Sequence, residues 1–339
     1  MKPFIFVFIA SLLFIACQQE PDVHIAEIQF GTMGTFGMVK IISDSLEIDE
    51  TAVLLKIDSV LHDVNMGVST YIDSSVIARS NQEGFLIEDG NEIHQSHFKE
   101  NLTRSLEIMK ETNGQFNIFV KPLIDFWGFG DYDKRNLLAK DSLSVDSVLN
   151  CIKSYEEFTR ETSVGCMQLD FSAIAKGYGV DQVASLLNRM NYERYMVEIG
   201  GEVFCKGKNA AEVFWRLGIE EPNENSRSIF EVIQLENRAM ATSGNYRNFK
   251  ILDNGQKVVH IINPSSGYPE ISNLLSASIV AENCMSADAY ATACMVMGVD
   301  TCFDFLLNHP ELEGYLIYSD EAGQLKVKQT KGFEEMIVE

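Results

Sequence analysis

The chain has 339 residues, of which 27 are lysine or arginine and 49 are aspartate or glutamate, so its formal net charge at pH 7 is −22. A surface with this excess of negative charge repels nucleic acid and anionic lipid, which disfavours a DNA- or RNA-binding role. A nucleotide ligand remains compatible with the charge, because a metal ion and the backbone N–H groups of a helix start can meet its phosphates. The length permits one large domain or two compact ones.

The N-terminus has the form of an export signal. One lysine precedes an apolar run from Phe4 to Ile15, which is too short to span a bilayer comfortably. Ala16 and Cys17 follow, and the sequence FIAC resembles a bacterial lipobox, in which the cysteine becomes the lipidated first residue. Phe14 stands where leucine is usual.

We therefore expect a signal peptide over residues 1–16, lipidation at Cys17, a lipid-anchored linker over residues 17–28 and a domain over residues 29–339. The protein would face the periplasm of a bacterial cell envelope, held by its lipid to the inner or the outer membrane. The alternative is a plain signal peptide with a chance cysteine.

Strand-like and helix-like segments alternate from about residue 25 onward, without repeats. Hydrophobic periodicity predicts helices over residues 49–64, 101–116 and 286–298. It predicts β-rich segments over residues 37–43, 195–207, 212–222, 228–244 and 276–281, and a hairpin around residues 321–323. Because the order is not strictly β-α-β, we expect an α+β fold, with residues 131–166 as a variable insertion.

Seven cysteines are scattered along the chain, without C-x-x-C or metal-finger spacing. Disulfides are open to an exported protein, but several of these cysteines fall in apolar helical patterns. We therefore expect mainly buried free thiols.

The segment DFSAIAKGYGVD, residues 170–181, is rich in small residues. Apolar residues at helical spacing follow it, which predicts a turn from a strand into a helix around Lys176–Gly177. Exposed N–H groups at such a helix start attract anions, phosphate above all. One such turn does not identify a ligand.

Two oxygen-bearing side chains share one face of the helix predicted over residues 286–298. Asp288 and Thr292 are four residues apart and are hard donors of the kind that Mg²⁺ prefers. The alternative is a helix start capped by Ser286, with Asp288 facing the helix dipole. On these residues alone the alternative is the better interpretation.

Several histidine and tyrosine side chains are also candidates for ligand contacts, although each can equally be explained by an ordinary structural role. His260 ends an apolar strand at a turn and is equally well explained as a packed strand histidine. Tyr71, in a loop, has the flat ring that stacks on an aromatic ligand, although a loop tyrosine is more often structural. His94 and His97, three apart near a helix start, are expected on the solvated surface rather than at a zinc site.

Seven segments, taken together and in order, resemble the ApbE-type lipoproteins, the FAD:protein FMN transferases. They span about Thr32 to Gly298 and read GTMGT, STYIDSSVIARSN, DFSAIAKGYGVDQVA, EIGGEV, ATSGNYRNF, HIINPSSGYP and ADAYATACMVMG. Their number and order make the resemblance specific.

The resemblance implies a single large ApbE-like, T-fold-like α+β domain of mixed sheets and helices. It implies Mg²⁺-dependent transfer of the FMN moiety of FAD to a threonine hydroxyl of a target flavoprotein, with release of AMP. The implied partner is an exported or membrane-bound flavoprotein subunit that carries the acceptor threonine.

The resemblance also assigns residues. Those implied to contact FAD are Met33, Tyr71, Gln115, Phe116, Asn117, Asp170, Lys176, His260 and Ile261. Asn117 stands where the family often has aspartate. The implied Mg²⁺ ligands are the side chains of Asp288 and Thr292 and the carbonyl of Ala173. Asp288 and His260 are both candidates for the base that takes the hydroxyl proton.

Two other functions remain open. Water attacking in the same pocket would make the protein a Mg²⁺-dependent FAD pyrophosphatase that yields FMN and AMP. A non-catalytic FAD-binding lipoprotein is disfavoured, because flavin binding alone would not require Asp288, Thr292 and Lys176 together.

Overall fold

The computed structural model describes residues 23–338, apart from residues 45–46, 84–90, 131–141, 161–165, 224–227, 246–248, 252–256 and 271. The expected signal peptide and Cys17 lie outside the described residues. Within the described ranges, no helix is long and apolar enough to cross a bilayer.

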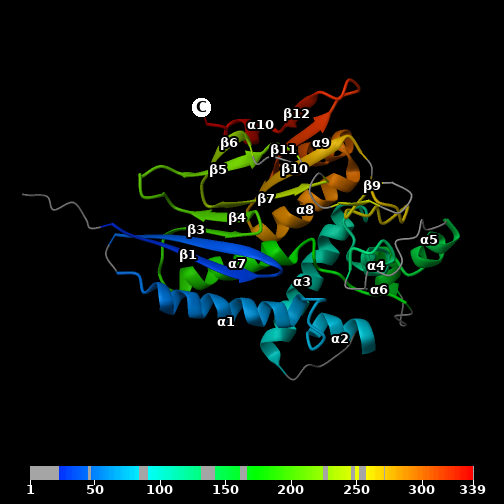
Figure 1. The fold of residues 1–339 in the computed structure, drawn as a ribbon, viewed down its shortest axis with the longest axis horizontal. Helices are drawn as coiled ribbons and strands as arrows, with labels where there is room; N and C mark the ends of the chain where they lie inside the picture. Colours follow the sequence, from blue (N-terminus) through cyan, green and yellow to red (C-terminus); the bar gives the residue numbers. More distant parts are fainter. Residues whose placement is uncertain are drawn as a thin grey trace, which may run out of the picture.

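The centre of the molecule is an antiparallel sheet of eight strands in the order β1-β2-β3-β4-β7-β10-β11-β12 (Figure 1). Its strands are β1 (His24–Thr32), β2 (Thr35–Ser43), β3 (Arg194–Ile199), β4 (Glu202–Lys206), β7 (Arg238–Gly244), β10 (Leu274–Ala281), β11 (Glu313–Ser319) and β12 (Leu325–Gln329). Two small sheets pair β5 (Trp215–Glu220) with β6 (Ile229–Leu235) and β8 (Phe249–Ile251) with β9 (Lys257–Val259).

Helices form a layer on one face of the large sheet, and the β5–β6 hairpin and α10 cover the other face (Figure 1). The helices are α1 (Glu50–Val68), α2 (Val76–Glu83), α3 (Glu92–Glu111), α4 (Lys121–Phe126), α5 (Ser142–Leu149), α6 (Tyr155–Arg160), α7 (Ala175–Arg189), α8 (Cys284–Met297), α9 (Val299–Leu307) and α10 (Lys331–Glu334), with a 3₁₀ turn η1 at Ile118–Val120. The expected α+β domain is confirmed.

The first hairpin begins earlier than expected. Ala26, Ile28 and Phe30 alternate with exposed residues and bury their side chains in the helical-layer core, so β1 starts at His24, inside the expected linker. The Phe30 ring lies over Gly37 on β2, where a Cβ would come within 2.4 Å of it.

Helix α8 occupies the middle of the helical layer and is buried on nearly every side, between the sheet and helices α3 and α7. Its cap is Asn283, whose side chain accepts a hydrogen bond from the Ser286 N–H at 2.9 Å. The expected cap, Ser286, instead has its hydroxyl bonded by Arg104 of α3. Asn283, not Ser286, therefore caps this helix, which differs from the alternative interpretation of the sequence. The Asp288 carboxylate accepts a hydrogen bond from Gly177 of α7.

The cysteines differ from the expectation in part. Cys151 pairs with Cys166, and Cys294 of α8 pairs with Cys302 of α9, whereas Cys205 and Cys284 are buried free thiols. The helical pattern explains why Cys294 and Cys302 are buried, but it gives no information about which side chains meet once α8 and α9 pack together.

This pairing predicts a definite thiol count. In protein lacking residues 1–17, iodoacetamide under denaturing, non-reducing conditions should add two carbamidomethyl groups, at Cys205 and Cys284. After reduction the count should rise by the four disulfide cysteines. Peptide mass spectrometry checks both numbers, and alkylation of Cys294 without reduction would contradict the pairing.

Candidate active site

The site is built where α7 lies against α8. The Gly177 N–H donates to Asp288 Oδ2 at 3.0 Å, and a Cβ at residue 177 would stand 2.2 Å from the Cys284 carbonyl oxygen. Only glycine permits the two helices to approach this closely. The contact fixes Asp288, which is 2% exposed, against the first turn of α7.

The start of α7 differs from the expected anion-binding turn. The segment before Ala175 is not a strand, and three of the amides at the start of the helix already donate to protein acceptors. The N–H groups of Ala175 and Tyr178 donate to the carbonyls of Phe171 and Ile174, and that of Gly177 donates to Asp288. These three donors are not available to phosphate, whereas the Lys176 side chain brings a positive charge to this point.

Lys176 joins two buried carboxylates. Its Nζ lies 2.7 Å from Glu202 Oε1 and 3.6 Å from Asp288 Oδ1. Burial opposes the charged form, but the carboxylates of Asp288 and Glu202 outweigh it and raise the pKa of Lys176. Burial raises the pKa of Glu202 to about 7, against the lowering effect of Lys176. Lys176 is therefore an ammonium at neutral pH.

The oxygen donors expected for Mg²⁺ lie in this region. Thr292 follows Asp288 by one turn of α8, and its hydroxyl is 3.2 Å from that of Ser243 on β7. Ala173 precedes α7 and stands one turn before Gly177. Among the described residues no three His, Cys, Asp or Glu side chains form a metal cluster. One carboxylate, one hydroxyl and one carbonyl still fit Mg²⁺, which retains waters and binds substrate phosphates.

Met33 and Tyr71, implied to contact the flavin, belong to the β1–β2 turn and to the segment after α1, and a hydrogen bond joins this turn to the last part of α1. Met33 has a positive φ of 48° in the β1–β2 turn, and its Cε reaches Gly179 of α7. Asn65, near the end of α1, donates to Thr32 at the same turn. Tyr71 follows α1 and is 62% exposed, so its ring is accessible from solvent.

Residues 115–117, implied to contact FAD, also make contacts within the protein. Phe116 is buried in the core, and the Asn117 side chain accepts from the Phe119 N–H and donates to the Lys153 carbonyl. Gln115 is half-buried and precedes them. Asp170 pairs its own N–H with the Ile118 carbonyl, which joins this loop to the α7 start.

His260 and Ile261 belong to a second group, after β9. The His260 ring lies edge-on to Phe129 with ring centroids 6.5 Å apart, and Ile261 is buried. Trp127, beside Phe129 in the chain, donates to the Gly267 carbonyl. The structure thus brings Lys176 of α7 together with Asp288 and Thr292 of α8, places Ala173 just before α7, and places His260 in a separate segment after β9.

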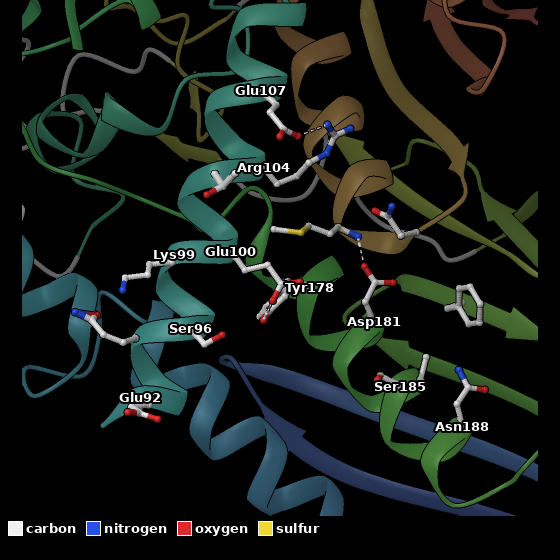
Figure 2. Close-up of a pocket in the computed structure, with 16 residues that line it drawn as sticks. Glu92, Ser96, Lys99, Glu100, Arg104, Glu107, Tyr178, Asp181, Ser185 and Asn188 are labelled. Atoms are coloured by element: carbon white, nitrogen blue, oxygen red, sulfur yellow. Dashed lines mark hydrogen bonds and ion pairs between the residues drawn. The ribbon is translucent and has the colours of Figure 1, made fainter. Parts of the chain in front are cut away.

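A hollow of about 1020 Å³ lies between α3, α7, β4 and the start of α8 (Figure 2). None of the residues predicted from sequence lines it. Its charged residues are Glu92, Glu100, Glu107, Asp181, Lys99 and Arg104, so carboxylates outnumber cations. Because a dinucleotide pyrophosphate is anionic, this hollow suits FAD less well than the surroundings of Lys176.

His94 and His97 lie beside this hollow on α3, and the expectation of a solvated surface is wrong. Both are half-buried. His97 Nδ1 is 2.7 Å from the Tyr178 hydroxyl, and His94 Nε2 is 3.2 Å from Asp63. The partners come from other helices, which the local sequence could not reveal.

Asp181, at the edge of the hollow, fixes the start of α8. Its carboxylate accepts from the N–H groups of Cys284 and Met285, both at 2.8 Å. Burial, together with the nearby carboxylates of Glu100 and Asp288, raises the pKa of Asp181 to about 7 despite these two donors.

A pH dependence follows. The folded protein holds the Asp181 proton more tightly than the unfolded chain, whose ordinary pKa is 3.8. This contribution to stability is therefore complete below pH 3.8 and is lost as the pH rises through 7. Urea unfolding at pH 5 to 8 should show a falling free energy of unfolding, with a smaller fall for Asp181→Asn. An equal fall in the free energy of unfolding for wild type and Asp181→Asn would contradict the raised pKa of Asp181. Because the pKa of Glu202 is shifted in the same direction, the free energy of unfolding of the variant should still fall with pH, but less steeply.

The fold and the site define an α+β enzyme domain in which a half-buried lysine lies between two buried carboxylates, and known proteins are similar to this chain. A family model described as the ApbE family matches residues 33–316. An FAD:protein FMN transferase of Vibrio cholerae is 35% identical, over 86% of this chain and 87% of its own. One of Haemophilus influenzae is 32% identical, over 96% and 95%. The solved structure of the flavin transferase ApbE from Vibrio cholerae has a TM-score of 0.81 at 30% identity and covers 93% of this chain and 99% of its own.

The chain belongs to the ApbE family. The expected enzyme class, FAD:protein FMN transferase, is confirmed by these relatives.

Sequence reasoning did not assign Glu202 or Asp181. Glu202 lies within the quoted segment EIGGEV, and Asp181 ends DFSAIAKGYGVD. The signal for Glu202 was a charged residue that directly follows two glycines and precedes three apolar residues of a strand. Asp181 carried no comparable signal, because its partners are backbone groups more than a hundred residues away.

Proposed function

We propose that this enzyme transfers the FMN moiety of FAD to a threonine hydroxyl of a flavoprotein, with Mg²⁺ as cofactor and AMP as the leaving group. The observation that carries the proposal is the cluster of the half-buried Lys176 with the buried carboxylates of Glu202 and Asp288, with the Thr292 hydroxyl one turn away on α8. A cation at neutral pH beside oxygen donors for Mg²⁺ suits a pyrophosphate substrate.

Each residue of the proposed site has a separate role in the transfer. Asp288, Thr292 and the Ala173 carbonyl would hold Mg²⁺, which when bound supplies positive charge to the phosphate oxygens. Lys176 adds a second positive charge. The threonine oxygen forms a bond to the FMN phosphorus, the bond from that phosphorus to the AMP oxygen breaks, and the hydroxyl proton passes to Asp288 or His260.

The test is a product analysis. The enzyme is incubated with FAD, Mg²⁺ and a threonine-bearing acceptor flavoprotein, and the intact mass of the acceptor and the free nucleotides are measured. We expect one added FMN per acceptor, located on threonine by peptide sequencing, and an equal amount of AMP. Free FMN in place of modified acceptor would favour the pyrophosphatase, and unchanged FAD would favour an FAD-binding lipoprotein.

We also propose that the chain is lipid-anchored through Cys17 at the bacterial cell envelope and faces the periplasm. The FIAC sequence supports this, and so do the disulfides Cys151–Cys166 and Cys294–Cys302, because disulfides persist in oxidising compartments. An acylated N-terminal Cys17 in membrane extracts, with release of Cys17→Ser from membranes, is the expected result. An unmodified mature N-terminus would contradict it.

A further inference from the structure

Glu202 is a buried acid with one oxygen engaged and one left over. It opens β4 and is 4% exposed. Its Oε1 accepts from Lys176 Nζ at 2.7 Å, while Oε2 has no hydrogen-bond partner within the described part of the chain. An unpaired buried carboxylate oxygen costs stability, so the position calls for a reason other than folding.

The local backbone is shaped to hold this carboxylate. Gly200 and Gly201 have φ values of 64° and 105°, and a Cβ at residue 200 would stand 2.9 Å from the Thr35 Cγ2 atom and 3.4 Å from Glu202 Oε2. Two glycines are needed for this turn, and they place Glu202 at the first position of β4.

The position of Glu202 affects the two carboxylate oxygens of Asp288 differently. Its Oδ2 is fixed by the Gly177 N–H, whereas its Oδ1 faces the Lys176 ammonium at 3.6 Å, beyond hydrogen-bond distance. The ammonium is drawn to Glu202 instead. The three side chains together carry one net negative charge when Glu202 is ionised, and would be neutral without it.

We propose that Glu202 is a positioning residue for Asp288. It holds the Lys176 ammonium away from Asp288 Oδ1, so that this oxygen is open to a divalent cation instead of being closed in a direct ion pair. The inference rests on the proposed function, in which Asp288 is a cation ligand. Residues that orient a metal ligand typically change metal affinity by about 10- to 100-fold when they are replaced.

The test measures cation binding, separately from turnover. Mn²⁺ is the probe, and free Mn²⁺ is counted by electron paramagnetic resonance with the mature full-length protein in detergent, without FAD. Glu202→Gln keeps the size and the acceptor but loses the charge, so Mn²⁺ binding should weaken about tenfold. Raising Mg²⁺ should restore transfer by this variant. In the double variant Lys176→Met/Glu202→Gln the ammonium is gone, and most of the lost affinity should return.

The control is Glu27→Gln, which breaks a surface pair with Lys40 at 3.1 Å on the first hairpin and should leave Mn²⁺ affinity unchanged. Unchanged binding by Glu202→Gln would overturn the inference, and so would a double variant as weak as the single one. If wild type and Asp288→Asn bind Mn²⁺ equally, Asp288 is not a cation ligand, which overturns both this inference and the metal part of the proposed function. Circular dichroism confirms that each variant is folded.

Discussion

Replacing Asp288 with asparagine should reduce covalent flavinylation by at least about 10²–10³-fold while leaving the protein folded. Asparagine keeps the shape and an oxygen that accepts from the Gly177 N–H, so the contact between α7 and α8 survives. It loses the charge that would hold a cation beside Lys176. The measurement is the rate of FMN addition to the acceptor, followed by intact mass.

Two comparisons make this result specific. Asp300→Asn removes an exposed carboxylate of α9, paired with Lys328, and should leave the rate unchanged. His260→Gln should keep Mn²⁺ binding whether or not it slows transfer, which separates a base from a metal ligand. Transfer by Asp288→Asn at a rate close to that of the wild type would contradict the assigned site.

Replacing Gly177 with alanine should destabilise the protein by about 2–3 kcal/mol, although alanine is the better helix former. Helix propensity alone predicts a gain of about 1 kcal/mol. The added methyl would meet the Cys284 carbonyl at 2.2 Å and the Asp288 Cβ at 2.9 Å, so α7 and α8 must separate. Transfer should fall as well, because the separation displaces Asp288.

The matched control is Gly179→Ala in the same helix. Its Cβ would approach the Cε of Met33, the end of a flexible side chain that can move aside. Urea unfolding should therefore show a loss of less than about 1 kcal/mol for this variant. Equal stability of the two variants would show that close packing of α7 on α8 is not needed.

Elements with a continuous apolar pattern were predictable from the sequence. Helix α1 and strand β2 match their expected ranges closely, because Val53, Ile57 and Leu61 recur at helical spacing and the strand residues alternate. Helix α3 was not fully predicted. It begins at Glu92, well before residue 101, and its buried face includes the polar residues Asn101 and Ser105, which an apolar pattern does not count.

The candidate site was predictable where motif residues lie on one helix. Asp288 and Thr292 fall on one face of α8 by spacing alone. The roles of Gly177, Glu202 and Asp181 depend on contacts between segments far apart in the chain, and no local pattern encodes them. The disulfide partners escaped prediction for the same reason.

The most direct test is a crystal structure of the enzyme with FAD and Mn²⁺, in which anomalous scattering locates the metal. The account predicts one Mn²⁺ bound by Asp288 and Thr292, at roughly 2 Å from their oxygens, with the pyrophosphate beside Lys176. A flavin bound in the hollow between α3 and α7 would contradict the account. So would a metal bound far from Asp288, with the Asp288 carboxylate still bonded to the Gly177 N–H and facing Lys176.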